Sequence, residues 1–448
     1  MKRILHQVWM IVALAVLVGA AASRIVPAVD IRGAGGAARP PLQVIGVAGC
    51  AAAACHGGTR PGERSEYMTW IQRDRHAQAY SVLFNERSQR IARNLSITQP
   101  ETDKRCLACH STAPELPHGE QFSKEDGVSC ETCHGPAGRW LVPHTRPDWK
   151  QKTAAEKYGP FGMTNTKDLA VRAAVCVRCH IGAPGQEVTH ELIAAGHPAL
   201  LFELDAYTAN MPPHWPENSK SQPANGARAW AIGQAVALRQ SLELLQSQAT
   251  SDRWPEFSQF ECYACHHQLR EKSWRQAVGY GARPPGGPVW SDPQWLIVQR
   301  LAASTGKKQN ATPEFDSLRV LLVRSNSSAS DVAAAAGKAV ATATQIIEQV
   351  KQQQWDGPRL RKLLSDLAEE LDATNLDYAT ALHITMALGT VLEAAVSADT
   401  GGGEAASIWS QKAKPHLDRL YDGLQVPADF DATKFVQDLK SFRNVVQE

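Results

Sequence analysis

The chain has 448 residues, of which 43% are hydrophobic, and its 47 basic residues nearly balance its 45 acidic residues. A net charge of only +2, without a run of basic residues, argues against a nucleic-acid partner. The length predicts two or three structural units.

The N-terminus has the pattern of an export signal. Two basic residues precede an apolar run from about Val8 to Val18, and the small residues Gly19 to Ser23 follow. This pattern, with its Ala-x-Ala cleavage site, predicts that residues 1–22 are a signal peptide; an uncleaved membrane anchor is the alternative, although the run is short for a full span. We expect the rest of the chain to be periplasmic or otherwise exported, with no further membrane-spanning stretch.

Five cysteine–histidine motifs account for all ten cysteines. Four have the regular Cys-x-x-Cys-His spacing: Cys106, Cys109 and His110; Cys130, Cys133 and His134; Cys176, Cys179 and His180; Cys262, Cys265 and His266. The first motif is irregular, because four residues separate Cys50 from Cys55 and His56. Two thiols at the regular spacing reach the two vinyl groups of one porphyrin, and the adjacent imidazole binds its iron. The chain is therefore predicted to bind haem c through all five motifs.

Two alternatives bear on these motifs. Zinc knuckles or a disulfide framework also use paired cysteines, but zinc sites have no need for a histidine after every second cysteine. For the irregular motif, a disulfide between Cys50 and Cys55, or a single thioether at Cys55, stays open.

The predicted fold class is mainly α, with a haem-packed, loop-rich domain followed by a helical bundle. Residues 40–220 are rich in Gly, Pro and His, hold four motifs, and lack long amphipathic periods. Residues 221–288 contain a predicted helix from Asn225 to about Gln248, the fifth motif, and an irregular connection at 281–288.

Residues 289–448 form the predicted helical C-terminal domain, which contains no cysteine. Its apolar periodicity predicts helices over Val332–Gln354, Leu360–Leu371, Leu376–Ala398, Ala405–Leu424 and Ala432–Val446. The two histidines of this region, His383 and His416, are expected to be solvated.

Each haem needs a second axial ligand, which sets its potential and decides whether the iron can bind a substrate. The candidates in the haem region are His76, His118, His144, His190, His197 and His214. His190 and His197 are seven residues apart, so on a helix they would share a face and could serve different haems. His214 follows two prolines, which present it rigidly. We favour these three as ligands over core, capping or pocket roles.

The motif arrangement from Cys50 to His180 resembles the tetrahaem cytochrome c-554 family of exported electron carriers. The segment Trp70–Ala79 (WIQRDRHAQA) is similar to a family helix that bears a distal ligand, which implies that His76 binds a haem attached later in the chain. The closest similarity is Gly127–His144 (GVSCETCHGPAGRWLVPH), which implies that His144 completes the iron held by His56. Three later segments, THELIAAGHP, MPPHW and FECYACHHQL, resemble larger multihaem relatives.

The chain departs from this family in two ways. The family has four haems and leaves its second haem five-coordinate, whereas this chain has a fifth motif and carries His118 after its second motif. His118 either closes that site or lies near solvent, and an open iron at His110 would bind small ligands such as nitric oxide, hydroxylamine or nitrite.

Close haem spacing predicts an electron carrier. His110 and His134 are only 24 positions apart, too close to enclose each haem in its own fold, so neighbouring porphyrins should approach closely. We expect mostly bis-histidine haems that pass electrons in a respiratory chain between redox partner proteins, with a membrane quinol-oxidising complex as one candidate. The alternatives are a multihaem oxidoreductase acting on a small nitrogen or sulfur compound at a five-coordinate haem, and a subunit whose helical tail docks a partner.

Overall fold

A computed structural model describes residues 41–59, 64–214, 224–266, 289–304, 312–324, 327–398 and 403–447. The predicted signal peptide, residue Trp215 and the predicted connection at 281–288 lie outside these residues. Leu42–Glu448 forms one compact unit. In the described part of the chain the regular structure is helical, with isolated β-bridges and no strand, so the mainly α prediction is confirmed.

The first part of this unit consists of short helices joined by loops. These helices are α2 (Glu66–Arg73), α3 (Glu86–Asn94), α4 (Lys104–His110), α5 (Cys130–His134), α6 (Ala154–Tyr158), α7 (Leu169–His180), α8 (His190–Ala194) and α9 (Leu204–Asn210). Three of them end at the histidine of a regular motif. Aspartate side chains begin two of these three: Asp103 accepts from the backbone N–H of Arg105, and Asp168 from those of Ala170 and Val171. These caps fix the starts of two helices whose last residue is a motif histidine.

Apart from the four-residue α11, the second part consists of longer helices. They are α10 (Ala224–Ala249), α11 (Cys262–Cys265), α13 (Pro293–Ser304), α14 (Pro313–Val323), α15 (Ala329–Gln352), α16 (Gly357–Leu367), α17 (Tyr378–Ala398), α18 (Gly403–Asp422) and α19 (Ala432–Gln447). All the helices predicted after residue 220 are present, with ends shifted by a few residues. Helices α13 and α14 were not predicted individually; each begins at a proline and is only three turns long, so its apolar pattern is short.

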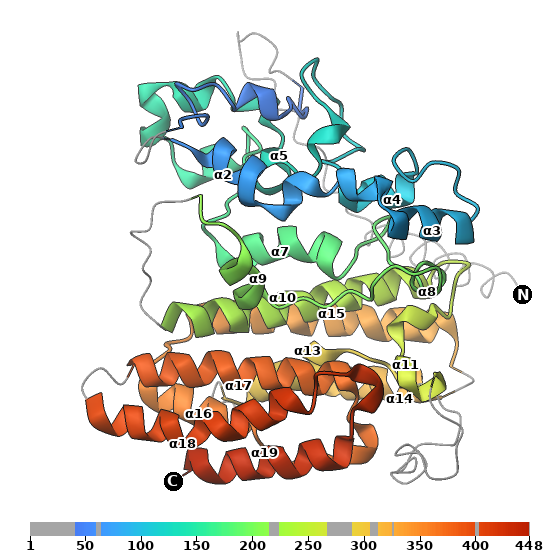
Figure 1. The fold of residues 1–448 in the computed structure, drawn as a ribbon, viewed down its shortest axis with the longest axis vertical. Coiled ribbons are helices and arrows are strands. Elements are labelled where there is room, and N and C mark those ends of the chain that lie inside the picture. The colour runs from blue at the N-terminus through green and yellow to red at the C-terminus, as the bar shows by residue number, and fades with distance from the viewer. Residues whose placement is uncertain are drawn as a thin grey trace, which may run out of the picture. The chain divides into compact units, whose positions relative to one another are not determined.

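Helix α10 is the central packing element, and it lies along α15 with α7 on its other side (Figure 1). Its buried side chains include Trp230, Leu238, Leu242 and Leu245. One continuous apolar cluster runs from Ala173 in α7 through α10 to the C-terminal helices. The helix that carries the fourth motif is therefore anchored on the long helices. The domain boundaries drawn from the sequence at 220/221 and 288/289 stay predictions.

Helix α17 corrects two expectations about the C-terminal region. Among the described residues it is the helix that is long and apolar enough to span a membrane, whereas no such stretch was expected after residue 23. Of the apolar stretch of this helix, 56% is buried within the protein. The helix packs against α10, α13, α16 and α18. His383 on this helix is only 1% exposed, not solvated. A helix that is apolar on most of its circumference is covered on several sides, which explains this burial.

His416 lies closer to solvent, as was expected for both histidines of this region. It is partly exposed on α18, and its Nδ1 accepts a hydrogen bond from the Arg419 guanidinium.

Candidate functional site

Four pairs of histidine rings face each other at nearly the same separation. Their ring centres are 6.3 Å apart for His56 and His144, 6.2 Å for His76 and His180, 6.4 Å for His134 and His214, and 6.1 Å for His190 and His266. In each pair one member ends a cysteine–histidine motif and the other is a predicted distal ligand. The structure thus brings together histidines that lie between 76 and 104 positions apart in the sequence.

This separation fits one metal ion between two imidazoles. A metal–imidazole bond is about 2 Å long and a ring nitrogen lies roughly 1.1 Å from its ring centre, so two opposed ligands place their ring centres about 6.2 Å apart. Direct ring stacking is much closer, as the 3.6 Å between the ring centres of His118 and Phe122 shows. The four pairs therefore have the width of an iron centre and not of an aromatic stack.

In each of four paired rings the Nδ1 atom has a hydrogen-bond partner. Those of His144 and His214 donate to carbonyls, at 3.2 Å to Trp140 and 3.4 Å to Pro212. Those of His56 and His76 face carboxylates, at 3.1 Å from Glu66 and 2.9 Å from Asp74. A carbonyl acceptor fixes the proton on Nδ1, which leaves Nε2 unprotonated and available to a metal.

Burial keeps two of the motif histidines neutral. It lowers the pKa of His134 to about 4, with a further contribution from the nearby His214 and His56. It also lowers the pKa of His180 to about 4, with a contribution from His76. Neutral imidazole is the form that binds a metal, so these rings can accept iron across the physiological pH range.

The motif sulfurs lie in neighbouring groups. The thiol of Cys50 hydrogen-bonds with that of Cys130, and the thiol of Cys109 with that of Cys179. These free thiols stand where thioether sulfurs would be formed by haem attachment. None of the ten cysteines is in a disulfide, Cys50 and Cys55 included. The first motif thus adjoins the third, and the second adjoins the fourth.

The second motif differs from the others. Its His110 bonds through Nδ1 to the Ala79 carbonyl at 2.6 Å, but within the described residues no histidine ring pairs with it at the spacing of the other four. His197 is its electrostatic neighbour: burial lowers the pKa of His197, and the charge of His110 adds to this effect. The Nδ1 of His197 donates to the Pro198 carbonyl at 2.8 Å.

His118 lies away from these pairs. It is exposed, stacks on Phe122, and its Nε2 bonds to the Ala113 carbonyl at 3.3 Å. The sequence left two positions open for His118, either as a ligand that closes the second site or near solvent. In the structure it lies near solvent.

The expectation that His190 and His197 share a helix face is wrong. Helix α8 ends at Ala194, and Gly196 follows with a φ of +121°, a left-handed conformation that suits glycine and turns the chain before His197. The two side chains nevertheless belong to different sites, because His190 faces His266 whereas His197 lies by His110.

Sequence reasoning missed the carboxylates that hold these sites. Glu131, inside the third motif, is 4% exposed and accepts from three backbone N–H groups, those of Ile45 at 2.9 Å, Gly46 at 2.7 Å and Ala137 at 2.6 Å. It ties the segment before the first motif to the third motif. The sequence feature that could have indicated this role of Glu131 is the presence of an acidic residue between the two cysteines of a motif.

The described residues contain no group of three or more histidine, cysteine or acidic side chains that could hold a metal ion unaided. Paired imidazoles beside paired thiols instead suit a group that brings its own equatorial ligands, as a porphyrin does. The fold and these sites define a multihaem c-type cytochrome.

Residues 50–135, which hold the first three motifs, match the family model described as "Cytochrome c554 and c-prime". This match supports a c-type cytochrome that works in electron transfer. No curated protein and no solved structure gave a match.

Proposed function

We propose that the chain is an exported pentahaem cytochrome c that passes electrons through closely spaced, mostly bis-histidine haems in a respiratory chain. The observation that carries this proposal is the set of four histidine pairs with ring centres 6.1 to 6.4 Å apart. Bound haem supplies one-electron chemistry, and the residues of the chain hold each iron, fix its ligand rings and set its electrostatic surroundings.

Contacts between the motifs support an order for the path. Cys50 and Cys130 join the first and third sites, and Cys109 and Cys179 join the second and fourth. Cys133 is an electrostatic neighbour of Cys176 and Cys179, which links the third site to the fourth. The proposed path therefore runs from the first site through the third and fourth to the second.

The fifth site extends this path. His190 at the start of α8 faces His266 of the fifth motif, while His197, just beyond the same helix, lies by His110 of the second motif. The backbone N–H of His190 donates to the buried Glu256 at 2.8 Å, which fixes α8 against the segment before the fifth motif. One short helix thus supports transfer between the second and fifth haems.

The proposed compartment and partners follow from the sequence. Export rests on residues 1–22, as a cleaved signal or as an anchor, and low-potential bis-histidine haems suit exchange with redox partner proteins such as a membrane quinol-oxidising complex. Electron transfer of this kind requires no acid–base residue.

A second candidate function is supported by the second site. Because no histidine ring among the described residues pairs with His110 at the spacing of the other pairs, its iron is the candidate for an open position in an oxidoreductase that acts on a small nitrogen or sulfur compound.

Electron paramagnetic resonance of the oxidised, fully loaded protein separates the two functions. A carrier should show low-spin ferric signals that nitrite and hydroxylamine leave unchanged. A high-spin signal that shifts with either compound would contradict the carrier proposal. Substitution His197→Ala should create such a high-spin signal, whereas the matched change His118→Ala, at an exposed ring, should not.

A further inference from the structure

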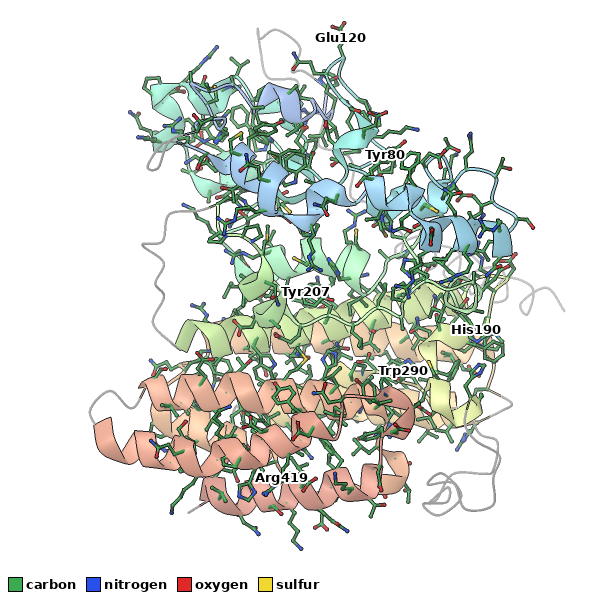
Figure 2. All side chains as sticks on the ribbon, viewed as in Figure 1. Tyr80, Glu120, His190, Tyr207, Trp290 and Arg419 are labelled. Carbon is green, nitrogen blue, oxygen red and sulfur yellow. The ribbon has the colours of Figure 1, made fainter. Side chains whose placement is uncertain are left out.

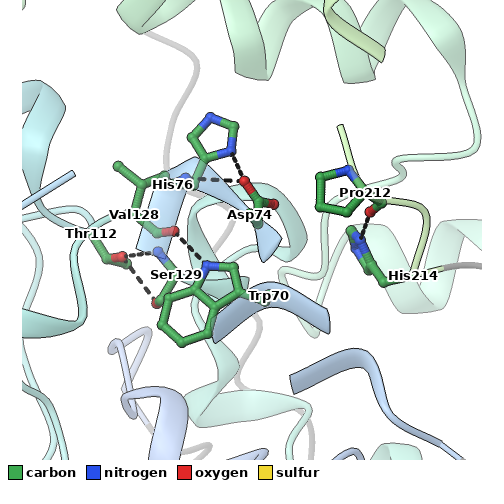
Figure 3. Close-up of polar contacts among 8 residues, drawn as sticks. All are labelled: Trp70, Asp74, His76, Thr112, Val128, Ser129, Pro212 and His214. Carbon is green, nitrogen blue, oxygen red and sulfur yellow. Dashed lines mark hydrogen bonds and ion pairs between the residues drawn. The ribbon is translucent and has the colours of Figure 1, made fainter. Parts of the chain in front are cut away.

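The ligand histidines differ in what accepts their Nδ1 proton. Four of them bond to uncharged backbone carbonyls, namely His110, His144, His197 and His214. In contrast, His76 bonds to the Asp74 carboxylate at 2.9 Å (Figure 3) and His56 to the Glu66 carboxylate at 3.1 Å. The two carboxylates also differ, because the Asp74 side chain is 6% exposed and that of Glu66 is 36% exposed. Solvent screens Glu66, whereas the charge of Asp74 acts in a medium of lower dielectric constant.

The local fold holds the Asp74 carboxylate in place. Its Oδ1 also accepts the backbone N–H of His76 at 3.0 Å, and its own N–H donates to the Trp70 carbonyl at 3.0 Å. The Trp70 indole N–H in turn donates to the Val128 carbonyl at 3.1 Å, and the Val128 N–H donates to the His76 carbonyl at 3.0 Å. The turn that carries Asp74 and His76 is therefore bonded on both sides to the segment that leads into the third motif.

Gly127 allows this close approach. Its φ is +64°, and a Cβ atom at this position would lie 2.8 Å from the His76 carbonyl oxygen. A larger residue would push the turn away, so the carboxylate–imidazole geometry depends on glycine here.

A carboxylate that accepts from Nδ1 strengthens the imidazole as a metal ligand. It also places negative charge near an iron that carries one more positive charge when oxidised, so it favours the ferric state. The carboxylate further interacts electrostatically with His214 and Cys133 of the third site. Its charge therefore reaches two neighbouring sites, and the fourth most directly because His76 pairs with His180.

We propose that Asp74 is a positioning residue that lowers the reduction potential of the haem held between His76 and His180, and more weakly that of the haem between His134 and His214. This inference rests on the proposed function, because it requires these pairs to bind haem iron. It adds a residue that sets how easily electrons occupy the middle of the path.

The test is a spectropotentiometric titration of the full-length, haem-loaded variant Asp74→Asn. Asparagine keeps the size, an acceptor oxygen and the helix-capping ability of aspartate while removing the charge. Loss of such an outer partner typically changes the metal equilibrium by about 10- to 100-fold, and tenfold corresponds to about 59 mV for one electron. We expect one redox step to rise by at least this amount and a second step to rise less.

Three matched variants sharpen the result. Asp74→Glu keeps the charge and should restore a potential near that of the wild type. Glu66→Gln should raise a different step by a smaller amount, because Glu66 is solvent-screened. Asp356→Asn makes the same charge change at another helix-capping aspartate, which accepts the Arg359 N–H at 3.0 Å in α16, and should move no step.

Potentials in Asp74→Asn equal to those in Asp356→Asn would overturn the proposal. Equal loss of low-spin haem in Asp74→Asn and Asp74→Glu would also overturn it, because Asp74 would then only shape the turn. The variant His76→Met identifies which idea has failed: an unchanged haem spectrum would show that His76 is not on iron and would refute the histidine pairing itself.

Discussion

His383 should make the stability of the protein depend on pH between about 4 and 6.5. The side chain is 1% exposed in α17, and its Nδ1 has no hydrogen-bond partner among the described residues. Burial lowers its pKa to about 4 from an ordinary value of 6.5. As the pH falls through this window the unfolded chain binds a proton that the folded chain does not, so stability is lost. A shift of about 2.5 units at 1.36 kcal/mol each corresponds to about 3 kcal/mol.

The assay is denaturant unfolding at pH 7 and pH 4, followed by helical circular dichroism. The wild type should lose about 3 kcal/mol more between these pH values than His383→Leu, because other titrating groups act equally on both proteins. His416→Leu, at a partly exposed histidine, should behave like the wild type. Equal losses in the wild type and His383→Leu would refute the reasoning.

Three further changes test the fold and the sites. His144→Ala should remove one ligand from the iron of the first motif and convert one haem to high spin, visible by electron paramagnetic resonance; unchanged spectra would contradict the pairing with His56. Glu131→Gln weakens three charged hydrogen bonds and should lower the unfolding free energy by roughly 1–3 kcal/mol in thermal unfolding, so an unshifted melting curve would count against that role. Leu242→Ala, fully buried on α10, should cost roughly 2–5 kcal/mol in denaturant unfolding, whereas Val320→Ala, 50% exposed, should cost much less; equal costs would contradict the packing described.

The sequence predicted the elements whose signals are local. The motif spacing is chemical, and the long helices repeat apolar residues at a helical period, so both could be recognised without a structure. The burial of His383 could not be recognised in this way. A helix that is apolar on most sides gives no sign of which face a single polar residue occupies. His190 and His197 show a second limit: seven-residue spacing suggested one helix face, but Gly196 ends the helix between them.

Pairing of distant histidines depends on the tertiary path of the chain. Only a family resemblance implied that His144 belongs with His56, and no local pattern indicated that His134 would face His214. The carboxylates Asp74 and Glu131 were missed for the same reason, since their partners meet only in folded loops. Contacts of this kind between distant loops leave no local pattern in the sequence.

Figure 2 shows the side chains on the fold and labels His190 on α8 and Tyr207 on α9. Tyr207 contacts the His180 ring at 4.9 Å between ring centres, so α9 borders the fourth site.

The intact mass of the exported, full-length protein tests the haem assignment most directly. We expect the mass of the polypeptide plus five covalently bound haems. A mass with four haems would show that Cys50 and Cys55 do not form a haem site and would leave His144 without an iron to complete. A mass with no haem would contradict the cytochrome assignment altogether.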